Sequence, residues 1–181
     1  TTEIYTLSLH DALPISAAKV HFLGCTLRAP DDIATRLVPL VIIVSTFGEQ
    51  DRDGTIGSHR IYKQIADWLA SRGIASIRFD DRGVGESSPS EPQSTMTDSL
   101  RDIQAVFEFA QTIQSVDPMK IGIVGHGLGA SLATRFATNQ NRVAFLICLA
   151  PPGLDGSRLN LEEMRGIAKL NNIEPSTMDM S

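Results

Sequence analysis

Residues 119–130, M-K-I-G-I-V-G-H-G-L-G-A, decide the fold of this chain. Ile121, Ile123 and Val124 form a short β-branched apolar run, which is typical of a buried strand. Three alternating glycines follow, and apolar residues then recur at helical spacing as far as Phe136. The stretch therefore predicts a strand, a tight glycine turn and a helix.

Two kinds of site are built on such a unit. In the nucleophile elbow, G-x-S-x-G, a sharp strand-to-helix turn lifts a serine above a parallel sheet. In the dinucleotide fingerprint, G-x-G-x-x-G/A, the glycines let a pyrophosphate approach the helix N-terminus. Residues 125–130, G-H-G-L-G-A, match the elbow except that Gly127 stands in the place of the serine. The same residues match the fingerprint through Gly125, Gly127 and Ala130.

Strand-like and helical patterns alternate on both sides of this unit. The apolar runs at 38–45, 74–79 and 143–149 are typical of strands buried on both faces, and 20–28 is typical of an edge strand. Amphipathic patterns predict helices at 58–72 and 97–115. We therefore expect an α/β fold with a mainly parallel sheet and helices on both faces. Ligands bind such sheets beyond the carboxyl ends of the strands, where the glycine turn lies.

The composition narrows the class of protein. The chain has 181 residues, 42% of them hydrophobic and 20% charged, which is typical of a globular domain. The net charge is −5 and no basic block is present, so we expect no nucleic-acid partner. The apolar run at 38–44 is too short to span a bilayer. We expect Cys25 and Cys148 to be buried free thiols, with no metal and no cofactor bound. Partner chains and the cellular compartment stay open, with the cytoplasm slightly favoured.

The ends of the chain differ from its middle. Residues 5–16 resemble a translated sequencing adapter, so we interpret 1–16 as an artefact or a disordered tail. We assign 17–155 to the N-terminal portion of the α/β core, and 156–181 to the start of a lid followed by a truncated tail. The helix expected at 159–170 begins this lid or covers the sheet. On this interpretation the chain is an N-terminal fragment.

Four motifs together resemble the α/β-hydrolases: V-I-I-V-S-T-F-G-E-Q-D-R-D-G, S-I-R-F-D-D-R-G-V-G-E-S, K-I-G-I-V-G-H-G-L-G and L-I-C-L-A-P-P-G. More narrowly, they resemble a bacterial serine-esterase family whose first loop reads G-S-G-P-Q-D-R-D-G and whose elbow reads G-H-S-E-G. The resemblance implies ester hydrolysis, in which the elbow serine attacks the carbonyl carbon and two backbone N–H groups stabilise the oxyanion.

The resemblance also assigns site residues. The oxyanion donors become the backbone N–H groups of Leu128 and Phe47. The substrate loop and pocket take in Gly48, Asp51, Arg52 and His126, and the D-R-D stretch at 51–53 is interpreted as a salt-bridged turn. The implied ligand is a small-molecule ester or carboxylate.

The chain departs from the family at the residues that carry the chemistry. Gly127 replaces the nucleophile, Thr46 and Phe47 replace the loop's glycine and serine, and Glu49 replaces its proline. The acid and the histidine of the triad follow the serine in this fold, but no histidine follows His126. Nucleophile, acid and base are therefore absent, and we expect no useful esterase activity. Two alternatives stay open: a dinucleotide-binding domain at 125–130, and a non-catalytic module that binds small molecules.

Overall fold

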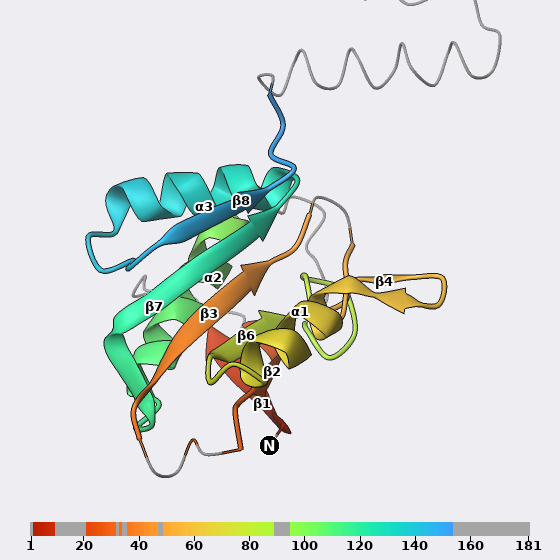
Figure 1. The fold of residues 1–181 in the computed structure, drawn as a ribbon. Coiled ribbons are helices and arrows are strands. Elements are labelled where there is room, and N and C mark those ends of the chain that lie inside the picture. Colours follow the sequence, from red (N-terminus) through yellow and green to blue (C-terminus); the bar gives the residue numbers. More distant parts are fainter. Residues whose placement is uncertain are drawn as a thin grey trace, which may run out of the picture. The chain divides into compact units, whose positions relative to one another are not determined.

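The computed structural model describes residues 2–9, 21–31, 33, 36–46, 49–88 and 95–153. Its main sheet has six strands in the order β1-β2-β6-β3-β7-β8 (Figure 1). The strands are β1 (Thr2–Leu9), β2 (His21–Arg28), β3 (Val38–Val44), β6 (Ala75–Phe79), β7 (Val116–His126) and β8 (Leu146–Leu149). β2 is antiparallel to both β1 and β6, whereas β6, β3, β7 and β8 are parallel to one another.

Helices cover both faces of this sheet. α1 (Ile61–Ala70) packs on one face, and α2 (Met96–Thr112) and α3 (Leu128–Asn139) pack on the other (Figure 1). A capping contact starts α2, because the Asp98 carboxylate accepts a hydrogen bond of 2.8 Å from the Thr95 N–H. The predicted α/β class, with a mainly parallel sheet and helices on both faces, is confirmed.

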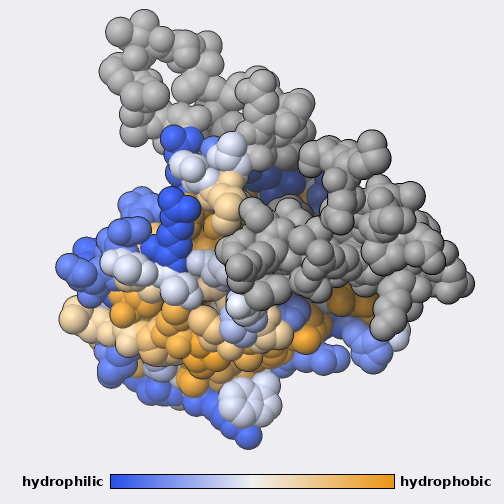
Figure 2. Space-filling view, turned by 90° about the horizontal axis from the view of Figure 1, so that it is seen from above, coloured by the Kyte–Doolittle hydropathy of each residue, from blue (hydrophilic) through white to orange (hydrophobic). Residues whose placement is uncertain are grey.

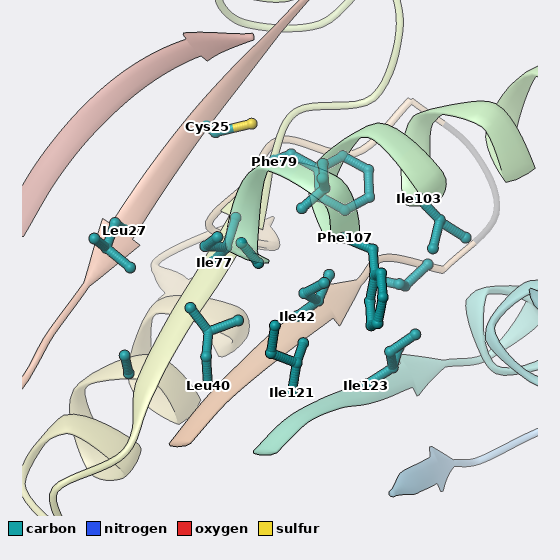
Figure 3. Packing of buried hydrophobic residues seen from close by; sticks show 14 of the residues in the cluster. Cys25, Leu27, Leu40, Ile42, Ile77, Phe79, Ile103, Phe107, Ile121 and Ile123 are labelled. Atoms are coloured by element: carbon teal, nitrogen blue, oxygen red, sulfur yellow. The ribbon is translucent and has the colours of Figure 1, made fainter. Parts of the chain in front are cut away.

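The larger core lies between the sheet and the pair α2 and α3. Phe107 of α2 is 1% exposed and packs edge to face on Phe136 of α3, with ring centroids 5.5 Å apart. Figure 3 shows Phe107 and Ile103 pointing toward the isoleucines of the central strands. A smaller cluster lies on the other face, under α1. This packing holds β3, β6 and β7 in register, so that their carboxyl ends meet at one edge of the sheet.

The face that carries α1 is less well covered. An apolar groove of about 620 Å³ runs between α1 and β8, where Trp68 is 55% exposed and Ile147 is 46% exposed. The space-filling view shows apolar residues gathered in a broad surface area with polar residues around it (Figure 2). In the described part of the chain no strand pairs with the outer side of β8. The predicted burial of 143–149 on both faces is therefore wrong for β8.

The exposed position of β8 also explains why one of the two cysteines is exposed. Both cysteines are free, and Cys25 is fully buried as predicted, but Cys148 in β8 is exposed. Burial raises the pKa of the Cys25 thiol to about 12. The prediction of two buried thiols is thus correct for Cys25 and wrong for Cys148.

Several element boundaries differ from the sequence expectation. The helix expected at 58–72 begins at Ile61, because β4 (Thr55–Ile56) and β5 (His59–Arg60) form a short hairpin before it. The elbow strand is longer than expected and begins at Val116. Its first residues pair with β3 through an irregular register, which accommodates the proline at 118.

The assignments of the chain ends stay predictions. Thr2–Leu9 forms β1, which pairs with β2 along its whole length. The adapter interpretation concerns the origin of residues 5–16 and stays a prediction. Contacts divide the chain into Thr1–Pro151 and Pro152–Ser181. The lid helix expected at 159–170 lies outside the described residues, as does the whole of the predicted 156–181 segment. No helix in the described ranges is long and apolar enough to cross a membrane.

Candidate active site

The turn after β7 has the backbone of an elbow but no side chain at its tip. Gly127 has φ 55° and ψ −127°, a conformation that residues with a Cβ rarely adopt. Its N–H donates to the Leu149 carbonyl over 2.9 Å, and its own carbonyl accepts from the Ala130 N–H over 3.1 Å. A Cβ at Gly129 would overlap the Ser45 carbonyl oxygen, so glycine there lets α3 approach β3. The turn is therefore held in shape without the serine.

Only one of the two predicted oxyanion donors can be placed. Leu128 is the first residue of α3, so its N–H is one of the helix N-terminal groups that have no intrahelical acceptor. The partial positive charge of the helix N-terminus adds to that donor. Phe47 and Gly48 lie outside the described residues. The assignment of Leu128 and Phe47 as an oxyanion pair thus stays a prediction.

A tyrosine joins the first loop to the elbow. The Thr46 N–H donates to the Tyr62 hydroxyl over 3.0 Å, and the same hydroxyl lies 3.0 Å from His126 Nδ1. Burial raises the pKa of Tyr62, which keeps the hydroxyl protonated. The Tyr62 hydroxyl therefore connects the backbone of the first loop with the His126 ring. The predicted site residue His126 is therefore fixed from α1, and the N–H of Thr46 is already in use.

Arg52 holds the first loop against the turn after β6. Its guanidinium donates to Asp80 Oδ2 over 2.5 Å and to Glu86 Oε2 over 2.6 Å, and its backbone N–H donates to Asp80 Oδ1 over 2.7 Å. Burial alone would raise the pKa of Asp80, but the hydrogen bonds from Arg52 and from the Glu86 N–H outweigh it and lower the pKa. Asp53 likewise forms a salt bridge, with Arg78. The D-R-D stretch thus has the contacts of the salt-bridged turn that its sequence suggests.

The neighbouring Asp81 has a different environment. Its carboxylate accepts from the Ser45 hydroxyl over 2.8 Å and from the Gln50 N–H over 3.0 Å. Burial raises the pKa of Asp81 to about 6, although the hydrogen bonds from Ser45 and Gln50 act to lower it. Asp51 differs again, because its Oδ1 accepts the N–H groups of Asp53 and Thr55 and so closes the turn locally. Each aspartate in this corner therefore holds a loop.

A cavity of about 290 Å³ opens beside the elbow. Its lining combines apolar side chains with hydroxyl and charged groups: Val44, Ser45, Thr46, Glu49, Phe79, Asp81, Arg82, Thr95, Asp98, Ser99, Asp102, Ile103, Leu128 and Leu132. Leu128 thus borders the cavity. Asp51, Arg52 and His126 do not line this cavity, and their assignment to the substrate loop or pocket stays a prediction. The Arg52 side chain contacts Asp80, the Asp51 carboxylate accepts from its own turn, and the His126 ring contacts Tyr62 of α1.

Three contacts of this site were not expected from the sequence. They are the Tyr62 link, the Ser45–Asp81 hydrogen bond and the approach of Thr46 to Gly127. Tyr62 is a buried residue of α1 in the structure. No spacing rule connects residue 62 with residue 46 or 126. In the described residues no group of three or more His, Cys, Asp or Glu side chains is placed to hold a metal ion.

Comparisons with known proteins agree with this geometry. The family model for serine aminopeptidases of family S33 matches residues 53–172, about two thirds of the chain. Esterase EstD of Thermotoga maritima is 31% identical over 115 residues, which are 63% of this chain and 27% of that protein. The polyketide transferase claH of Penicillium crustosum is 32% identical over 89 residues, or 48% of this chain and 29% of that protein.

Solved structures show the same fold. The α/β-hydrolase GrgF from Penicillium sp. sh18 superposes with a TM-score of 0.65 at 20% identity, over 96% of this chain and 57% of that one. Est1E from Butyrivibrio proteoclasticus, solved with ferulic acid bound, has a TM-score of 0.61 at 25% identity, over 72% and 49% of the two chains. The chain therefore spans about half the length of these neighbours. With the elbow after β7 and the family match around it, this chain belongs to the serine aminopeptidase S33 family of α/β-hydrolases.

Proposed function

We propose that this chain keeps the binding elements of an esterase site and lacks the chemistry, so that it binds small esters without hydrolysing them at a useful rate. The observation that carries the proposal is Gly127, which holds the backbone angles of the elbow but offers no oxygen for attack. Loss of the catalytic serine in a well-studied serine protease lowers kcat by about 10⁶. That factor corresponds to about 8 kcal/mol of transition-state stabilisation.

The remaining groups do not compensate for this loss. His126 is the sole histidine of the elbow, and its Nδ1 is engaged by the Tyr62 hydroxyl. A base must reach the proton that it abstracts, and a glycine carries none to abstract. The acid of a catalytic triad holds the imidazole of the histidine. Asp80 instead forms a salt bridge with Arg52. The Leu128 N–H at the start of α3 still offers a donor for a carbonyl oxygen.

The charge of the cavity favours neutral ligands. Four carboxyl groups line it, those of Glu49, Asp81, Asp98 and Asp102, against one guanidinium. That guanidinium, of Arg82, already pairs with Asp102 over 2.7 Å. A carboxylate would therefore be repelled, whereas the apolar wall at Ile103 and Leu132 suits a short acyl chain. We propose neutral esters as ligands in preference to the corresponding acids.

Two measurements test this function. A fluorophosphonate probe should label no serine of the chain, under conditions that label an active serine esterase completely; stoichiometric labelling would refute the loss of chemistry. In ¹H–¹⁵N spectra, ethyl butyrate should shift the Leu128 amide, and butyrate at pH 7.5 should shift it less. Ser99→Trp, which fills the cavity, should remove the ester response, while Glu108→Trp on the exposed side of α2 should keep it. An unchanged Leu128 amide with both ligands would refute ester binding.

The dinucleotide-binding alternative predicts a different sequence context around the glycine turn and a different ligand. The fingerprint normally opens its domain, and its ribose-binding acid lies about 20 residues on, at the end of the next strand. Here β7 follows two earlier parallel strands, and β8 reads L-I-C-L, without an acid. A fluorescence titration that showed tight NADH binding would favour this alternative over the ester-binding proposal.

A further inference from the structure

The Thr46 side chain occupies the space that a side chain at position 127 would need. A Cβ built on Gly127 would overlap Thr46 Oγ1 and lie 3.1 Å from Thr46 Cβ. The next nearest heavy atom, at 3.8 Å, is Thr46 Cα, so the three nearest atoms all belong to this one residue. The close neighbour of a side chain at position 127 is therefore a single residue, Thr46, which lies two positions after the end of β3.

The surroundings of Thr46 prevent it from withdrawing. Its N–H is held by the Tyr62 hydroxyl at 3.0 Å. The residue before it, Ser45, is held through its hydroxyl by Asp81 at 2.8 Å, and its carbonyl lies against Gly129. A β-branched side chain also has few χ1 rotamers, and two of the three staggered positions around Cβ carry a heavy atom. A side chain at 127 would thus meet an obstacle that is fixed at its backbone.

We propose that Thr46 and Gly127 are a matched pair, in which Thr46 is the positioning residue that fills the tip of the elbow in place of a side chain at 127. The esterase loop and elbow that this chain resembles have glycine at the position of Thr46 and serine at that of Gly127, so the two positions have exchanged bulk. Reversion of Gly127 alone would then crowd the elbow rather than restore a nucleophile. The inference rests on the proposed function only in taking 127 as the former nucleophile position.

A double-mutant cycle in urea tests the pairing without any need for activity. Gly127→Ala should lower the unfolding midpoint through backbone strain and through overlap with Thr46. Thr46→Ala removes the overlapping Oγ1, so the double variant should recover about half of that loss. Gly57→Ala is the matched control, because Gly57 has φ 60° but no heavy atom within 4 Å of a built Cβ. Thr46→Ala should recover none of the loss caused by Gly57→Ala.

Each outcome of the cycle decides the question. If the effects of Thr46→Ala and Gly127→Ala simply add, as in the Gly57 control, the pairing is wrong. If Gly127→Ala fails to fold and the double variant folds, the pairing is supported. If neither folds, removal of Thr46 Oγ1 has not relieved the elbow, and the proposal is overturned.

A thiol placed at the elbow gives a second, local measurement. Gly127→Cys introduces a thiol that iodoacetamide can alkylate, and peptide mass spectrometry separates it from the exposed Cys148. The introduced thiol should react several-fold faster when Thr46→Ala is added, while the rate at Cys148 stays the same. Equal rates with and without Thr46→Ala would contradict the pairing. Because neither test measures hydrolysis, the pairing and the ester-binding proposal can each fail alone.

Discussion

Two structures at the carboxyl edge of the sheet hold their shape by different physical means. The corner between β3 and β6 is held by charge, through Arg52 between Asp80 and Glu86. The elbow after β7 is held by close backbone approach, which its glycines permit at 125 and 129. The stability of the corner therefore depends on the protonation of its carboxylates, whereas that of the elbow does not. Substitutions and pH should therefore separate the two, although they lie at the same edge.

The largest expected effect is on the corner. Arg52→Ala would leave Asp80, whose side chain is 2% exposed, as a buried carboxylate without its cation. Breaking a buried pair in this way typically destabilises a protein by about 3–5 kcal/mol. Arg101→Ala is the control, because Arg101 pairs with Asp98 from a side chain that is 61% exposed. The control should change the free energy of unfolding by less than about 1 kcal/mol in urea titrations.

The effect of Arg52→Ala should also depend on pH. In the native chain the pKa of Asp80 is lowered, so its contribution to stability is present at neutral pH and is lost as the pH falls through that pKa. In the variant, burial remains without Arg52, and the pKa of Asp80 should rise. The difference in unfolding free energy between the native chain and the variant should shrink toward pH 4. A difference that stays constant from pH 7 to pH 4 would contradict the role of charge.

The next largest effect is on the elbow. Gly129→Ala would drive a Cβ into the Ser45 carbonyl oxygen, a backbone atom that cannot rotate away. We expect a loss of about 3 kcal/mol, at the upper end for overpacking. Gly153→Ala, with no heavy atom within 4 Å of a built Cβ, should have little effect. The loss from Gly129→Ala should be the same at pH 7 and pH 5, and a marked pH dependence would show that the elbow also relies on charge.

Asp81 tests whether every acid of the corner stabilises it. Because burial raises its pKa to about 6, the folded state binds its proton more tightly than the unfolded chain, and stability falls as the pH rises from about 4 to 6. Asp81→Asn should therefore stabilise the chain at pH 7, by about 2 kcal/mol after the loss of one acceptor for Ser45 or Gln50. The gain should vanish near pH 4. Thermal unfolding across this pH range measures it, and destabilisation at pH 7 would contradict the argument.

The comparison also explains what the sequence could predict. Near-continuous apolar runs predict the buried strands, and apolar residues repeated at helical spacing predict the helices. Both patterns can be detected in the sequence because each element buries a whole face or stripe of side chains. The elbow could be located because its glycines are local in sequence. The β4–β5 hairpin was missed because each of its strands has only two residues, too few to show a period.

The site was less predictable because its contacts join distant residues. Arg52 reaches Asp80 across 28 positions, and Tyr62 reaches His126 across 64. Charged residues in a loop indicate that ion pairs form, but not which partners they choose. The approach of Thr46 to Gly127 depends on how β3 and β7 pair within the sheet. Such a contact follows from the register of β3 and β7, which no pattern within either strand reveals.

The smallest expected effect shows that burial, rather than length, makes the corner pair strong. Lys63 and Asp67 on α1 lie 2.6 Å apart, nearly the separation of Arg52 and Asp80, but their side chains are 45% and 43% exposed. The Lys63 hydrogen bond is the largest cause that lowers the pKa of Asp67, and Arg28 adds to it. Lys63→Ala should therefore lower the free energy of unfolding by only about 0.3–0.5 kcal/mol, and 0.5 M NaCl should remove most of that difference. A loss from Lys63→Ala as large as that from Arg52→Ala would mean that distance alone sets the strength of these pairs, and the contrast between corner and elbow would then no longer rest on the buried charge of Asp80.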